Sequence, residues 1–125
     1  MLYDILAVGA GGFAGANARF LLAQWINARV APDWPWATFA INVTGSLLIG
    51  FGLVLMLERV DLDPRWRLLF VTGFLGAYTT FSTYSWELLA LLERRDLLGA
   101  ALYALGSVVV GLGATTLGAL LARWL

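Results

Sequence analysis

Apolar and polar positions form long separate blocks along this chain of 125 residues. Four apolar runs stand out, at about residues 5–26, 37–57, 68–92 and 97–121, and each has the roughly 20 residues that an α-helix needs to cross a bilayer. Most of the charged residues and all three prolines lie between these runs. Backbone groups in hydrocarbon must find hydrogen-bond partners within the protein, which helices achieve. The pattern therefore predicts one all-α integral membrane domain over residues 1–125, with four transmembrane helices.

The composition agrees with this prediction and narrows the functional classes. Hydrophobic residues make up 61% of the chain and charged residues 13%, whereas soluble domains carry about 25% charged residues. The absence of cysteine excludes disulfides and thiolate metal sites, and the absence of histidine excludes imidazole ligands and the usual general base. The net charge of zero predicts no nucleic-acid partner. We expect no cleaved signal peptide, because no Lys or Arg precedes the first apolar run.

The arginines give almost no preference for one orientation in the membrane, although cytoplasmic loops normally carry an excess of Lys and Arg. With four spans, the N-terminus, the second loop and the C-terminus share one side. That side holds Arg59, Arg65, Arg67 and Arg123. The opposite side holds Arg29, Arg94 and Arg95. Either the orientation cannot be predicted from the sequence, or the chain inserts both ways and functions as an antiparallel pair.

Four strongly polar residues fall inside the apolar runs. They are Asn17 and Arg19 in the first run, Asn42 in the second and Glu87 towards the end of the third. Such side chains cost free energy inside a bilayer, so each is a candidate functional residue. For Arg19 and Glu87 we favour ion pairing or capping near an interface, which long side chains reach easily. Asn42 lies deeper, between apolar neighbours, and is harder to explain without a function.

Residue spacing predicts two polar stripes. Thr38, Asn42 and Ser46 are four residues apart and therefore share one helix face. In the fourth run the same spacing relates Tyr103, Ser107, Gly111 and Thr115. A shared narrow pathway is the interpretation that we favour for Thr38 and Asn42. Close helix packing is the alternative, and we favour it for the glycines, including the Gly11-xxx-Gly15 pattern.

The centre of the third run is rich in hydroxyl groups. In YTTFSTYS, residues 78–85, every residue except Phe81 carries one. Threonine hydroxyls compete for backbone hydrogen bonds, and Gly73 and Gly76 add conformational freedom just before them. Hydroxyls that bond only to their own helix are one interpretation. We favour a break near the centre of this helix, because non-helical backbone at membrane depth exposes carbonyl oxygens that coordinate ions.

Three segments together resemble the Fluc (CrcB) family of fluoride channels. They are GGFAGANARF at 11–20, TFAINVTGSLLIG at 38–50 and GFLGAYTTFSTYSWE at 73–87, and the likeness extends over the full length of the chain. The resemblance implies a small, antiparallel, dual-topology homodimer in the inner (plasma) membrane of a bacterium. It also implies a passive fluoride-selective channel that exports cytoplasmic fluoride and so reduces its toxicity, with no catalytic activity.

The same resemblance implies roles for individual residues. The implied fluoride pathway consists of Thr38, Asn42, Phe81, Ser82, Thr83, Tyr84, Tyr103 and Ser107. Many members have phenylalanine where this chain has Tyr84, and some have serine where it has Gly111. Gly76 and Thr79 match positions whose backbone carbonyls hold a structural sodium ion between the subunits. Arg19 and Glu87 match charged residues that are typical of the family.

Two other functions are compatible with a protein of this size. A proton-coupled drug antiporter similar to the small multidrug resistance transporters would also have four spans and dual topology. Those transporters need a glutamate in the first span, where this chain has Asn17 and Arg19. A scaffold subunit without transport would pass no ions at all.

Overall fold

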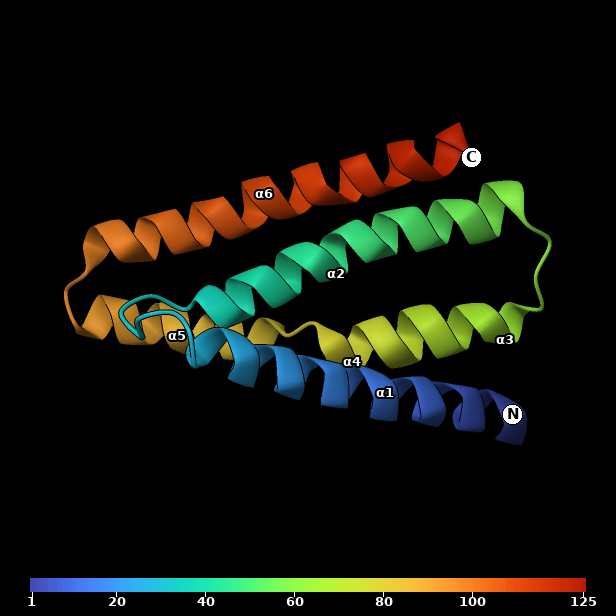
Figure 1. The fold of residues 1–125 in the computed structure, drawn as a ribbon, viewed down its shortest axis with the longest axis horizontal. Coiled ribbons are helices and arrows are strands. Elements are labelled where there is room, and N and C mark those ends of the chain that lie inside the picture. The colour runs from blue at the N-terminus through green and yellow to red at the C-terminus, as the bar shows by residue number, and fades with distance from the viewer.

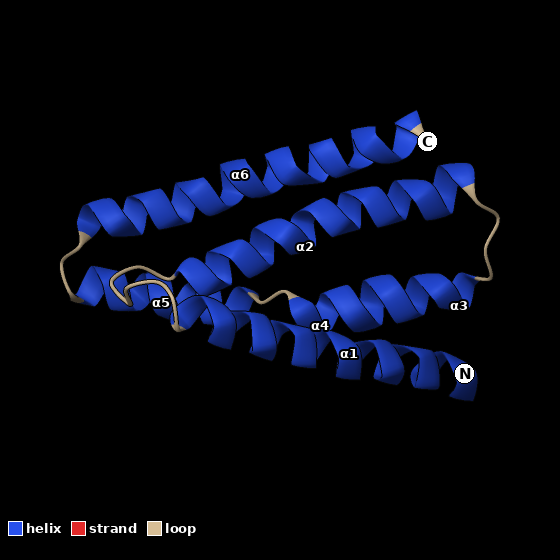
Figure 2. Cartoon of the chain, viewed as in Figure 1, coloured by secondary structure: helices blue, strands red, loops and turns tan.

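The computed structural model describes residues 1–125, except for the side chain of Arg59, and these residues form long helices joined by short loops (Figure 1). Within this described part there is no strand (Figure 2), so the prediction of an all-α protein is confirmed. Three continuous helical stretches are long and apolar enough to cross a membrane. They are α1 (Leu2–Asn27), α2 (Trp36–Val54) with its continuation η1 (Leu55–Arg59), and α6 (Leu97–Trp124).

The third apolar run forms a helix in two parts. The first part contains α3 (Pro64–Arg67), the π-helical segment η2 (Leu68–Leu75) and α4 (Gly76–Tyr78), and the second part is α5 (Phe81–Glu93). Between them, Thr79 and Thr80 are extended, with φ/ψ angles of −83°/161° and −151°/121°. This interruption, which we call the break, lies near the centre of the run. The predicted broken helix is therefore confirmed.

Both chain termini and the loop between η1 and α3 lie at one end of the bundle, and the other two loops lie at the opposite end (Figure 1). The ion pairs among the described residues lie at the first end, and two of them join different helices, Arg123 with Glu58 at 2.9 Å and Arg65 with Asp4 at 3.5 Å. The charged residues of this end are Asp4, Glu58, Arg59, Asp61, Asp63, Arg65, Arg67 and Arg123. Those of the opposite end are Arg29, Asp33, Glu93, Arg94, Arg95 and Asp96. Each end therefore carries as many acidic residues as arginines.

Helix α1 packs against η2 by direct approach of the two backbones. A Cβ atom at Gly11 would overlap the carbonyl oxygen of Leu69, and one at Gly15 would overlap the carbonyl oxygen of Phe74. Membrane helices approach this closely where small residues line the contact. The packing interpretation of the Gly11-xxx-Gly15 pattern is confirmed.

Two groups of buried side chains lie on either side of the break along the chain. Ile41, Leu75 and Tyr78 form the first group, which joins α2 to η2 and α4. Leu91, Ala100 and Tyr103 form the second group, which joins α5 to α6. The break therefore connects two packed regions of the bundle, and polar contacts between helices concentrate around it and in the second region.

Candidate functional site

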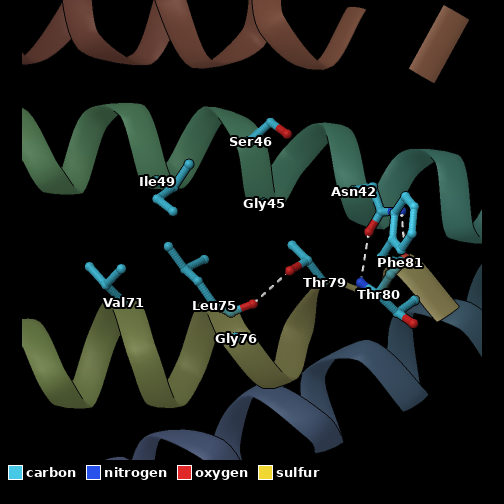
Figure 3. Close-up of a pocket in the computed structure, with 10 residues that line it drawn as sticks. All are labelled: Asn42, Gly45, Ser46, Ile49, Val71, Leu75, Gly76, Thr79, Thr80 and Phe81. Carbon is cyan, nitrogen blue, oxygen red and sulfur yellow. Dashed lines mark hydrogen bonds between the residues drawn. The ribbon is translucent and has the colours of Figure 1, made fainter. Parts of the chain in front are cut away.

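The break is fixed by Asn42 of α2. Its Nδ2 donates to the carbonyl oxygen of Thr80 at 3.0 Å, and its Oδ1 accepts from the backbone N–H of Thr80 at 2.9 Å (Figure 3). One side-chain amide thus satisfies both backbone groups of a residue that has left the helix. The hydroxyl of Thr80 in turn caps α5, because it accepts from the backbone N–H of Thr83 at 3.2 Å. Asn42 and Thr80 together specify where the helix stops and restarts.

The break also frees two backbone carbonyl groups. In a continuous α-helix the carbonyl of Gly76 would accept from the N–H of Thr80, and that of Thr79 from the N–H of Thr83. Both N–H groups donate to side chains instead, the first to Asn42 and the second to Thr80. The carbonyl oxygens of Gly76 and Thr79 are therefore available to a cation. Among the described residues, no group of three or more His, Cys, Asp or Glu side chains could hold a metal ion.

A second set of polar side chains, which we call the polar cluster, consists of Thr38, Glu87 and Tyr103. The carboxylate of Glu87 accepts from Thr38 Oγ1 at 2.9 Å and from Tyr103 Oη at 2.7 Å. Thr38 is buried and Tyr103 has no exposed surface. The cluster therefore ties α2, α5 and α6 together, and each carboxylate oxygen has one hydroxyl donor.

Ion pairing or capping, the role that we favoured for Glu87, is wrong, whereas its position near an interface stays a prediction. Its carboxylate binds two hydroxyl groups inside the bundle, and none of the ion pairs among the described residues includes Glu87 or Arg19. The packing of α5 against α2 and α6 brings Glu87 opposite Thr38 and Tyr103. Asn17 is exposed and donates to the carbonyl oxygen of Phe13 in its own helix at 2.7 Å. Asn17 and Arg19 of α1 thus lie outside the polar cluster.

Aromatic rings connect the polar cluster to the break. The rings of Phe81 and Tyr84 have centroids 5.7 Å apart, and those of Tyr84 and Tyr103 are 4.9 Å apart. Tyr84 Oη donates to the carbonyl oxygen of Ala104 at 3.4 Å. Tyr84 is thus held between the start of α5 and the second turn of α6.

A cavity of about 350 Å³ lies between α2 and the two parts of the broken helix (Figure 3). Its lining includes Asn42, Ser46, Gly76, Thr79, Thr80 and Phe81. Asn42 and Thr80 lie together at one end of it, whereas Ser46 points from α2 towards the ribbon of α6. The side chain of Phe81 lines this cavity and is 79% exposed in the single chain. The cavity therefore combines amide, hydroxyl, carbonyl and aromatic groups and contains no charged side chain.

The remaining predicted pathway residues are not among those that line the cavity. Ser82 and Thr83 are exposed, and their hydroxyls lie 3.4 Å and 3.0 Å from that of Thr80. Ser107 lies one turn beyond Tyr103 on α6, and its Oγ is buried without a hydrogen-bond partner in the described structure. The structure thus gathers Asn42 and Phe81 around the cavity, whereas Ser107 lies along α6.

Two residues that contribute to this arrangement were missed. Trp34 packs against Tyr103 with ring centroids 5.1 Å apart, and its Nε1 donates to the carbonyl oxygen of Gly99 at 3.3 Å. Its place in a loop gave no signal of this role. Thr80 belongs to the hydroxyl-rich stretch, which drew attention to its side chain. Only the three-dimensional position of Asn42 reveals that the Asn42 amide binds the backbone N–H and carbonyl of Thr80.

Known proteins resemble this chain over most of its length. A protein of Methylococcus capsulatus named fluoride-specific ion channel FluC is 48% identical over 123 residues, which are 98% of this chain and 54% of that protein. The chain therefore spans about half the length of that relative. Proteins of the same name from Acidobacterium capsulatum and Chlorobium chlorochromatii are 45% and 46% identical, over 90% and 97% of this chain and 90% and 93% of their own lengths. The family described as CrcB-like protein, Camphor Resistance (CrcB), matches residues 6–119, and the chain belongs to this family.

Proposed function

We propose that the chain forms a passive fluoride-selective channel that exports cytoplasmic fluoride across the bacterial inner membrane. The observation that carries this proposal is the broken helix fixed by Asn42, next to a cavity lined by amide, hydroxyl and aromatic groups. The names of relatives that are 45–48% identical support fluoride as the ion. The drug-antiporter alternative is not favoured, because the first span carries Asn17 and Arg19 in place of a glutamate.

Fluoride is small and tightly hydrated, so a pathway must replace its water with hydrogen-bond donors. Asn42 uses one of its two amide N–H bonds for Thr80, and the second is free to donate to an ion. The ring of Phe81 offers the positive edge of its π-system at the same cavity. The sequence has no lysine, whose compact ammonium group would hold the anion too tightly for release.

The polar cluster supplies further donors one helical turn from Asn42 along α2. The hydroxyls of Thr38 and Tyr103 both point at the carboxylate of Glu87. An ion that uses either hydroxyl must therefore compete with a carboxylate oxygen. This competition keeps the site from binding an anion so firmly that conduction stops.

An antiparallel homodimer is the functional unit of the proposal. The numbers of arginines at the two ends of the bundle are nearly equal, which removes the usual signal for one orientation. In the single chain Phe81 is 79% exposed and Trp86 is 69% exposed. Two-fold pairing would place the same surface of each copy, with its cavity and Phe81 ring, against the other.

One structural sodium ion completes the proposed dimer. The freed carbonyls of Gly76 and Thr79 would supply two oxygens from each copy, and four neutral oxygens suit a monovalent hard cation better than calcium or magnesium, which seek more ligands and negative charge. Such an ion holds the subunits together and is not transported. Fluoride flux should therefore show no coupling to a sodium gradient, whereas prolonged removal of sodium should lower dimer stability.

The test is fluoride efflux from liposomes that contain only this purified protein, recorded with a fluoride electrode. We expect rapid fluoride efflux and no chloride efflux under the same gradient. Drug-dependent proton movement would favour the antiporter. Efflux no faster than from protein-free liposomes would contradict the proposal and leave a scaffold role.

A further inference from the structure

Three hydroxyl side chains on α2, α5 and α6 donate to a carbonyl of their own helix. Thr44 donates to Ala40 and Thr116 to Leu112, four residues earlier, at 2.7 Å and 2.9 Å. Ser85 makes the same bond to Phe81 at 2.9 Å. A hydroxyl bonded in this way has already used its one donor. It offers little to a passing anion.

Ser46 and Ser107 are different. No hydrogen bond among the described residues involves either hydroxyl, and the Oγ atom of Ser107 is buried as well. A buried polar group without a partner is unfavourable and calls for an explanation. Ser46 lines the cavity beside Asn42, and Figure 3 shows its side chain on the side of α2 that faces α6. Both hydroxyls are thus free to donate along the contact between α2 and α6.

Gly111 shows how close the two helices are at Ser46. A Cβ atom at Gly111 would lie 3.5 Å from Ser46 Oγ, which is an ordinary van der Waals contact. Gly111 is also one turn beyond Ser107 on the polar stripe of α6. The hydroxyl of Ser46 therefore lies where this stripe has no side chain of its own.

Further along α2 and α6 the helices leave no room for another side chain. A Cβ atom at Gly50 would overlap the carbonyl oxygen of Thr115, and one at Gly118 would overlap that of Leu47. Ser46 and Ser107, the two hydroxyls described above as free to donate, therefore lie between the polar cluster and this close contact. Of these two residues, Ser46 also borders the cavity.

We infer that Ser46 is a fluoride-binding residue that passes the ion between the cavity at Asn42 and Ser107 of α6, in place of a hydroxyl that Gly111 cannot provide. This inference rests on the proposed channel function. The chemistry is a hydroxyl donor without a competing acceptor, and hydrogen bonds to a charged partner are the stronger kind. Glu87, whose carboxylate lies in the polar cluster, is engaged by Thr38 and Tyr103.

The test compares fluoride efflux from liposomes containing the unmodified protein or single and double variants. Ser46→Ala should lower the efflux rate about tenfold, as expected for the loss of one hydrogen bond to an anion. Ser46→Ala with Gly111→Ser should restore most of the rate, because the new hydroxyl arises from the facing position. Ser46→Ala with Gly111→Ala adds the same Cβ without the hydroxyl and should remain slow. Thr116→Ala removes a hydroxyl that is already bonded to Leu112 and should conduct normally.

The possible outcomes separate this inference from the channel proposal. If the unmodified protein conducts and Ser46→Ala conducts equally well, the role of Ser46 is excluded while the channel function stands. If Gly111→Ala rescues as well as Gly111→Ser, the effect of Ser46→Ala is one of packing and the inference fails. The absence of fluoride efflux from the unmodified protein would remove both. Elution of each variant as a folded dimer in size-exclusion chromatography ensures that the rates compare assembled proteins.

Discussion

The contact of α1 with η2 and the contacts of α2 with α5 and α6 differ: both regions bring backbones together at glycines, but only the second also carries hydrogen bonds between side chains of different helices. We call the first the apolar seam and the second the polar seam. In the apolar seam Gly11 and Gly15 bring the backbones together, so that a Cβ atom at either position would overlap a carbonyl oxygen of η2. No hydrogen bond between side chains of the described residues crosses it.

The polar seam depends on hydrogen bonds between helices. Glu87 joins three of them through Thr38 and Tyr103, and Asn42 binds the backbone at the break. Lipid tails are as apolar as leucine side chains, so the hydrophobic effect does not pull helices together within a membrane. The apolar seam is therefore stabilised by close van der Waals packing, whereas the polar seam carries polar side chains that cost free energy at membrane depth. We therefore expect α1 to act as a support and the proposed function to depend on the polar seam.

The largest effect on folding should come from the apolar seam. Gly15→Ala introduces a methyl group that overlaps the backbone of Phe74, so we expect the free energy of unfolding to fall by about 3 kcal/mol or more. Gly9→Ala is the matched control, because no atom lies within 4 Å of its new Cβ. There the better helix former should raise stability by roughly 0.5–1 kcal/mol. Thermal unfolding in detergent measures both, and equal stability of the two variants would mean that the seam is not closely packed.

The largest effect on conduction should come from Asn42→Asp in the polar seam. A carboxylate can still accept from the N–H of Thr80, but it cannot donate to the Thr80 carbonyl, and its charge repels fluoride in a medium of low dielectric constant. We expect fluoride efflux to fall by at least about a hundredfold while the protein remains dimeric. Asn27→Asp makes the same chemical change at the exposed end of α1 and should conduct normally. Normal conduction by Asn42→Asp would remove Asn42 from the pathway.

The sequence predicts the two seams unequally. Long apolar runs, close glycines and a cluster of hydroxyls depend on local physics, so the helices, the glycine contact and the break could be predicted. The partners of Asn42 and Glu87 depend on how each helix is rotated about its axis, which spacing along one helix does not determine. Asn42 was therefore interpreted as a donor to an ion, and its two bonds to Thr80 became apparent only in three dimensions. The π-helical turns of η2 likewise gave no sequence signal.

A smaller effect on conduction is expected for Phe81→Ile. The substitution keeps an apolar side chain and removes the ring edge, so efflux should fall about tenfold. The fold of the single chain should change little, because Phe81 is 79% exposed there, and any loss of stability should appear in the pairing of the two copies. Phe13→Ile on α1 is the control, since Phe13 is 76% exposed and lies away from the cavity. Equal efflux from the two variants would show that a ring at Phe81 has no special part in the polar seam.

The smallest effect is expected for Tyr84→Phe, which tests whether the polar seam works through its rings or through every hydroxyl on it. The substitution removes the bond of 3.4 Å to the carbonyl oxygen of Ala104, and keeps the ring contacts with Phe81 and Tyr103. A bond this long contributes little, so we expect the free energy of unfolding to fall by about 0.5 kcal/mol and the efflux rate to stay within about twofold. Fluoride efflux and thermal unfolding of the same preparation provide both numbers. If Tyr84→Phe abolished efflux from a folded dimer, the hydroxyl itself would be a ligand for the ion, and Tyr84 would act in the same way as Ser46 instead of acting through its ring.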